Sequence, residues 1–85
     1  MAMHIADPQY AQDRAEVIAA YHNARQHHDT AADALSCIAG ALVGLSVQHL
    51  SENGRVPYNI LIIMGEVAQW WTLASKGMPL PEDLL

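Results

Sequence analysis

The chain has 85 residues, which suffices for one small domain and leaves no room for separate cofactor and substrate domains. Four Lys and Arg residues oppose nine Asp and Glu, a formal net charge of −5. The chain therefore lacks the basic face with which proteins neutralise nucleic-acid phosphates. Hydrophobic residues make up 52% of the chain and charged residues 15%. Because small soluble domains carry about a quarter or more charged residues on their surface, we expect part of this apolar surface to contact another chain.

Cysteine content and hydropathy indicate the compartment. Cys37 is the only cysteine, so no internal disulfide can form, and a reducing cytoplasm is the expected environment. The segment from Met1 to Asp7 has neither the basic start nor the apolar run of a signal peptide. The most apolar stretch, residues 34–47, is shorter than the roughly 20 residues that cross a bilayer. We expect a cytoplasmic protein without membrane contact.

A first helix is predicted over about residues 8–28. Asp7 can accept hydrogen bonds from the free amides of the first turn, and Pro8 suits the first helical position. A narrow apolar stripe follows, formed by Tyr10, Val17, Tyr21 and Ala24. The other faces are polar, so this helix is expected on the surface of the domain.

A second helix is predicted over about residues 31–52. Thr30 and Asp33 fit the capping-box pattern that begins a helix. No residue breaks the pattern between the first two helices, so one continuous helix of about forty residues remains an alternative. One apolar seam consists of Leu35, Ile38, Leu42, Leu45 and His49, and another of Ala39, Val43, Val47 and Leu50. A helix that is apolar nearly all round is expected to be buried on several sides.

Three small residues recur every fourth position on this second helix: Ser36, Gly40 and Gly44. A glycine inside a helix costs about 1 kcal/mol relative to alanine, so a packing reason is expected. We predict that another helix approaches closely along this strip.

A third helix is predicted over about residues 57–76, after the turn signals Asn53-Gly54 and Pro57. Gly77 ends it, and residues 77–85 are expected to form an extended tail because neither of their prolines fits a helix interior. One stripe at heptad spacing consists of Ile60, Ile63, Val67, Trp70 and Ala74, and a second of Leu61, Met64, Ala68 and Trp71. The sequence thus predicts one all-α domain, a three-helix hairpin or bundle.

Three helices this apolar cannot hide all their faces within a 9.3 kDa chain, so a homo-oligomer is expected. Trp70 and Trp71 point about 100° apart on a helix, so one can fill the core while the other faces elsewhere. Tryptophan is also enriched in binding hot spots. The predicted interface residues are Trp70, Trp71, Met78, Ile60, Ile63 and Val67. A second surface is predicted on the polar face of the first helix, at Asp13, Glu16 and Gln26.

Residues for catalysis or metal binding are not arranged in a usable pattern. Among the histidines and acids between His22 and Asp33, only Asp29 and Asp33 fall at the three- or four-residue spacing that places two ligands on one helical face. A solvated, ion-paired face of Arg25, Asp29 and Asp33 is expected instead. Cys37 lies mid-helix among apolar residues, the position of an inert packing cysteine. Paired carboxylates and a glycine-rich phosphate loop are absent from the sequence, so we expect no enzyme, metal or cofactor.

The size, acidity and helical make-up resemble those of nuclease-bacteriocin immunity proteins, but the Asp-Ser-x-x-Gly motif of that family is missing. The Glu-x-x-Glu motifs of the helical pyrophosphohydrolases are missing as well. The sequence therefore indicates no family.

The function expected from these features is stoichiometric binding by a small accessory protein. It would inhibit a larger protein or act as its adaptor, as proteins encoded by phages or mobile elements often do. An alternative is an oligomer that binds a small molecule or nucleotide at its subunit boundaries. Residues for that ligand site would be Tyr21, Arg25, His27 and His28.

Overall fold

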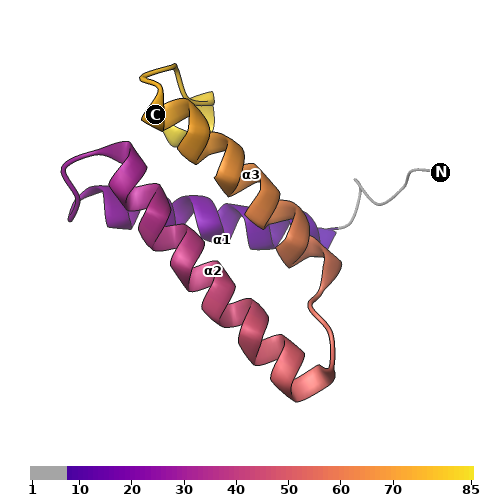
Figure 1. Cartoon of the computed structure of the whole chain (residues 1–85). Coiled ribbons are helices and arrows are strands. Elements are labelled where there is room, and N and C mark those ends of the chain that lie inside the picture. The colour runs from indigo at the N-terminus through magenta and orange to yellow at the C-terminus, as the bar shows by residue number, and fades with distance from the viewer. Residues whose placement is uncertain (1–7) are drawn as a thin grey trace.

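The fold is all-α, as predicted. The computed structural model describes residues 8–85, so the predicted cap Asp7 and the segment before it lie outside the described residues. The elements in chain order are α1 (Pro8–Arg25), α2 (Ala31–Asn53), α3 (Tyr58–Ser75) and the short 3₁₀ turn η2 (Glu82–Leu84) (Figure 1).

α1 and α2 are separate helices, so the single long helix is excluded. α1 ends at Arg25, three residues earlier than predicted, and the amide of His27 bonds to the carbonyl of Ala24 at 2.9 Å in the turn that follows. Thr30 is extended, and its hydroxyl accepts a hydrogen bond from the amide of Asp33 at 3.1 Å. This side-chain acceptor replaces a backbone carbonyl, and so the chain starts a new helix here.

Glycines end α2 and α3 where the sequence predicts. Gly54 has a φ of 77° and donates its amide to the carbonyl of Leu50 at 2.9 Å, which closes the last turn of α2. Gly77, just beyond α3, has a φ of 71°. Both angles lie in the left-handed region that glycine enters without a steric penalty.

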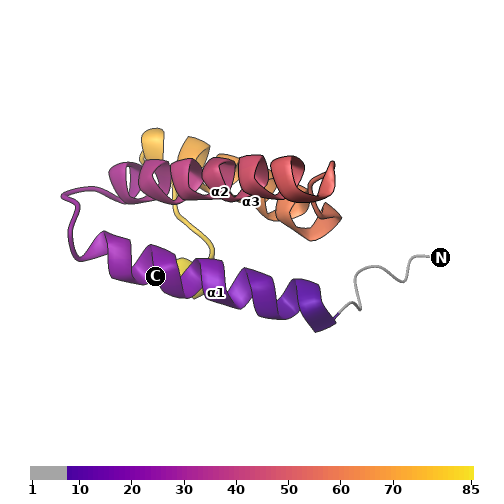
Figure 2. The same cartoon turned by 90° about the horizontal axis from the view of Figure 1, so that it is seen from below.

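The helices form two layers (Figure 2). α2 and α3 contact each other in one layer, and α1 crosses beneath them together with η2. The molecule measures 36 × 30 × 20 Å. Its shortest extent matches two helix layers of about 10 Å each. Thus α1 covers one side of the α2–α3 layer, and nothing within residues 8–85 covers the other.

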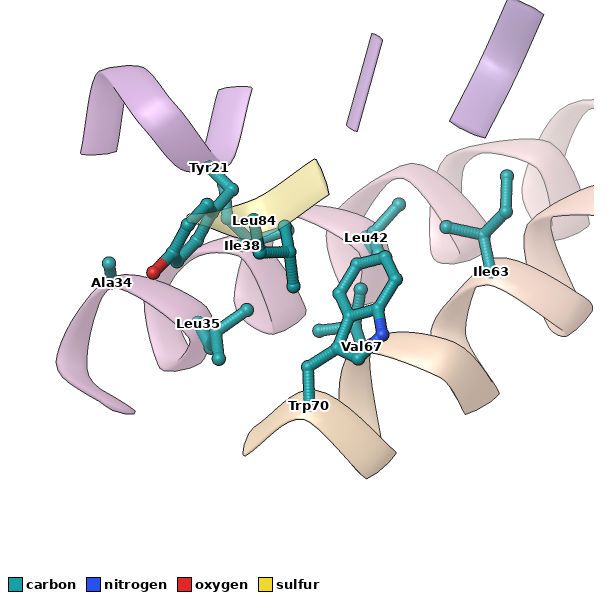
Figure 3. Packing of buried hydrophobic residues seen from close by; sticks show 9 residues of the cluster. All are labelled: Tyr21, Ala34, Leu35, Ile38, Leu42, Ile63, Val67, Trp70 and Leu84. Atoms are coloured by element: carbon teal, nitrogen blue, oxygen red, sulfur yellow. The ribbon is translucent and has the colours of Figure 1, made fainter. Parts of the chain in front are cut away.

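The core lies between the two layers (Figure 3). Its buried residues are Tyr21, Ala34, Leu35, Ile38, Leu42, Ile63, Val67, Trp70 and Leu84. Ile63, Val67 and Trp70 of the heptad stripe of α3 therefore face the core, although the sequence predicts them at an interface. Tyr21 comes from the predicted stripe of α1 and points toward α2 in Figure 3.

Burial of α2 on several sides was a wrong prediction. Leu35, Ile38 and Leu42 are buried, but the second seam is not: Val43, Val47 and Leu50 are all exposed. Within residues 8–85, α2 packs mainly against α1 and α3, on the side that carries Leu35, Ile38 and Leu42. The remaining arc of the helix meets no other element among the described residues.

The C-terminal tail is not extended throughout, contrary to the prediction. Residues 78–81 lead back toward α1, and Leu84 in η2 is inserted into the core with 3% of its surface exposed. Burying a leucine side chain contributes about 1.5–3 kcal/mol. A single leucine in a proline-rich segment has no hydrophobic period, which is why the sequence pattern does not reveal it.

We expect Leu84→Ala to lower the free energy of unfolding by about 2–4 kcal/mol, because it leaves a cavity in the core cluster to which Leu84 belongs. Leu85→Ala is the matched control, since Leu85 is 83% exposed, and it should change stability by less than about 0.5 kcal/mol. Urea unfolding followed by helical circular dichroism measures both. If both substitutions lowered the free energy of unfolding by the same small amount, the packing of η2 against the core would be contradicted.

Candidate protein-binding face

The adjacent tryptophans face different environments. Trp70 is 4% exposed and fills the core, with the Arg14 guanidinium 5.4 Å from its ring centroid. Trp71 is 44% exposed. This confirms that one ring is internal and the other external. It also corrects the predicted interface, because Trp70, Ile60, Ile63 and Val67 are buried within this chain and only Trp71 and Met78 are exposed.

Trp71 borders an apolar groove between α2 and α3. The groove has a volume of about 630 Å³ and no lining residue from α1. Its lining consists of Ser36, Ala39, Met64, Val67, Ala68, Trp71 and Thr72. Its polar side-chain groups are two hydroxyls and the indole N–H of Trp71, and the Thr72 hydroxyl donates to the Ala68 carbonyl at 2.9 Å. The groove therefore offers shape and apolar surface rather than charge.

Exposed apolar side chains extend this groove along both helices. On α2, Val43 and Val47 follow Ala39 at steps of four residues, and Leu50 comes three residues later. Residues at these spacings share one side of a helix. On α3, Leu61 lies two turns before Ala68 and is half exposed. We call the groove residues together with Val43, Val47, Leu50 and Leu61 the outer face.

The outer face contains no charged residue. Between positions 34 and 51, α2 has no Asp, Glu, Lys or Arg, and the only charged residue of α3 is Glu66. Glu66 is directed to α1, where it accepts hydrogen bonds from the Tyr10 hydroxyl at 2.7 Å and from Arg14 Nε at 2.9 Å. The single charged residue of α3 thus lies on the opposite side of the layer.

Gly40 and Gly44 of α2 are not covered by any other part of the described chain. No heavy atom lies within 4 Å of the position that a Cβ would take at Gly40 or Gly44. Close packing along Ser36, Gly40 and Gly44 is therefore not made by any described helix of this chain. α3 instead contacts the adjoining side of α2, where Ser46 Oγ lies 3.2 Å from Met64 Sδ.

The second predicted surface is only partly brought together. Asp13 and Glu16 border a smaller groove of about 220 Å³ between α1 and α2. Gln26 lies beyond the end of α1, in the turn, and does not line it. Met78 lies in the segment after α3, where its amide donates to the Leu73 carbonyl at 2.9 Å, and it borders neither groove.

The residues of the alternative ligand site do not converge on a cavity. Tyr21 is buried in the core, with its ring edge-on to His22 at 5.4 Å. Arg25 Nη1 donates to the carbonyl of His28 at 2.8 Å, and His27 is exposed in the turn. Neither groove has any of the four predicted residues in its lining.

Two further expectations about polar residues are corrected. The ion pairs found within residues 8–85 both involve Arg14, so the predicted pairing of Arg25 with Asp29 and Asp33 is wrong. α1 ends at Arg25, and the four-residue helical spacing to Asp29 is lost. Cys37 is exposed rather than packed. In the described part of the chain, no three His, Cys, Asp or Glu side chains are grouped so that they could hold a metal ion.

A polar cluster that the sequence does not reveal joins α1, α3 and η2. Arg14 pairs with Glu66 through Nε and with Asp83 through Nη1, both at 2.9 Å. His22 Nε2 donates to the Asp83 carbonyl at 3.0 Å. Hydrogen bonding by Arg14 lowers the pKa of Asp83, and the bond to Glu66 raises the pKa of Tyr10. The cluster fixes α1 and the tail against the inner side of α3.

By length and composition alone, α2 (Ala31–Asn53) is long and apolar enough to cross a bilayer. The most apolar stretch of the sequence, residues 34–47, is only the central part of this helix. Core helices of water-soluble proteins satisfy the same criterion. In this structure its buried side packs on α1 and α3.

Comparison with protein-family models, curated proteins and solved structures finds no match to this chain. Its function is therefore argued from the outer face itself.

The Arg14–Asp83 pair predicts a specific acid sensitivity. The folded-state pKa of Asp83 lies below its ordinary value of 3.8, so its stabilising effect is present above that pH and is lost as pH falls through the lowered pKa. Asp83→Asn should lower the Tm at pH 7, and the difference from the original chain should shrink below about pH 4. Thermal melts at pH 7 and pH 3 measure this, with Glu82→Gln as control. A Tm difference of the same size at both pH values would contradict the role of this pair.

Proposed function

We propose that this chain acts by stoichiometric binding to another protein chain, and that the outer face is the binding surface. The observation that carries the proposal is an apolar groove, with an exposed tryptophan at its border, on a face without charge. Monomeric proteins rarely expose continuous apolar patches of more than a few hundred Å². Covering such a patch removes apolar surface from water, which contributes about 25 cal/mol per Å².

The chemistry of the face favours protein over nucleic acid or an anionic membrane surface. Phosphates are bound by Lys and Arg, and the outer face has neither. Helices that lie on anionic lipid carry basic residues along their polar flank, whereas Lys76 at the end of α3 is the nearest base on that helix. An apolar surface of another protein requires no such charges. Tryptophan at the centre of such a contact supplies much of the binding energy in known interfaces.

Catalysis has no comparable support at this groove. None of the lining side chains titrates near neutral pH, so the groove supplies no general acid or base. The ligand site at Tyr21 and Arg25 has no support either, because both side chains make contacts within the chain. A role as an inhibitor or adaptor of a larger protein agrees with this binding chemistry.

The two tryptophans should separate binding from folding. Trp71→Ala should lower the free energy of unfolding by less than about 1.5 kcal/mol and weaken partner binding at least tenfold, as expected for a hot spot. Trp70→Ala should instead cost about 3–5 kcal/mol of stability. Chemical unfolding measures the stability of both variants, and titration calorimetry with the partner measures the binding affinity of Trp71→Ala.

The partner is either a second copy of the chain or a protein captured from host extract and then purified. Ala19→Glu, on the exposed side of α1, is the binding control. The proposal is wrong if neither a second copy nor another protein binds. It is equally wrong if Trp71→Ala leaves the affinity unchanged.

A further inference from the structure

We propose that the partner of the outer face is a second copy of this chain. Two α2–α3 layers would pack face to face about a twofold axis, with one α1 on the outside of each. This inference rests on the proposed function, because it names the partner of the same surface.

The layer arrangement provides the first argument. In a stable helical domain each apolar layer is covered by another layer. Here the α2–α3 layer is apolar on both sides, and the 20 Å thickness of the molecule accommodates only α1 in addition to it. A second copy has the same uncovered apolar layer, so a single contact between the two copies covers both outer faces.

Charge provides the second argument. An ion buried against the outer face would lose its hydration without gaining a counter-ion, so the partner must present an uncharged apolar surface. The outer face of another copy meets this condition. The net charge of −5 does not oppose the contact, since the acids within residues 8–85 lie on α1, in the turns, at the helix ends and in the tail, and Glu66 faces α1.

Each end of the α2–α3 layer also carries both signs of charge. Asp33 and Lys76 flank the groove at one end, one turn beyond Ser36 and Thr72 respectively. Glu52 and Arg55 lie at the other end, around the turn that joins the two helices. Both ends can therefore form a mixed polar rim around an apolar centre, as protein interfaces commonly do.

Size provides the third argument. α2 has 23 residues, about 35 Å of helix, and two packed helices are about 20 Å wide. The layer therefore presents roughly 700 Å². A standard stable interface buries about 800 Å² on each partner, so a symmetric pair of these faces has the area that a dimer needs.

In a twofold-symmetric dimer each residue contact occurs twice. The exposed small residues of α2 can then pack against large side chains of the second copy. Gly40 and Gly44 leave open space beside the groove, while Trp71 and Leu61 protrude from α3. Small residues on one copy can receive large side chains of the other. This gives a packing reason for two helical glycines that meet no other atom within residues 8–85.

The test is the mass of the full chain in solution, measured by light scattering behind a sizing column and by sedimentation equilibrium. We expect twice the 9.3 kDa chain mass, falling toward one chain mass on dilution. Ala68→Glu places a carboxylate in the groove of both copies and should raise the dimer dissociation constant at least 100-fold. Ala19→Glu adds the same charge on the exposed side of α1 and should leave the dimer intact. Helical circular dichroism verifies that both variants fold.

Each other outcome overturns the inference in a recognisable way. A chain that stays monomeric up to about 100 μM excludes the dimer. The proposed function then survives only if a different protein binds with sensitivity to Trp71→Ala. A dimer that Ala68→Glu does not weaken uses another surface. A monomer that sediments with neutral phosphatidylcholine vesicles, but not when it carries Ala68→Glu, has a lipid surface as its partner, and both proposals fail.

Discussion

One constraint governs this molecule: α2 is apolar around most of its circumference, and within residues 8–85 it packs mainly against two helices, α1 and α3. α1 and α3 bury Leu35, Ile38 and Leu42, and the opposite arc of α2 remains in contact with water. The net stability of a small domain is only a few kcal/mol, so an apolar face of this extent is costly to leave bare. Contact with another chain relieves that cost, and the proposed binding function follows from it.

The polar cluster around Arg14 lies on the inner side of the layer, beside the core. Arg14 pairs with Glu66 and Asp83, and thereby holds α1 and η2 against the inner side of α3. Leu84 completes the core on the same side. Because Glu66 is the only charged residue of α3, this pairing also leaves the outer face uncharged. The ion pairs thus lie on the inner side together with the core, and the outer side carries no charge.

Local signals in the sequence were sufficient for the helices but not for their neighbours. Thr30, Gly54 and Gly77 place the helix ends correctly, because caps and left-handed turns depend on nearby residues. The stripe of α3 identifies its core side, since periodicity records burial. It does not tell whether the burying partner belongs to the same chain, so Trp70 and Val67 were assigned to an interface although they lie in the core. The Arg14 pairs join residues 52 and 69 positions apart, and no local pattern encodes such contacts.

The central claim is that Trp71 and the groove beside it are covered by another chain when the protein is assembled. Acrylamide quenching of tryptophan fluorescence tests this most directly in a Trp70→Phe variant, where Trp71 is the only tryptophan. Our account predicts weak quenching at high protein concentration and strong quenching after dilution, as the second copy dissociates from the outer face. Strong quenching that does not change with protein concentration would contradict it.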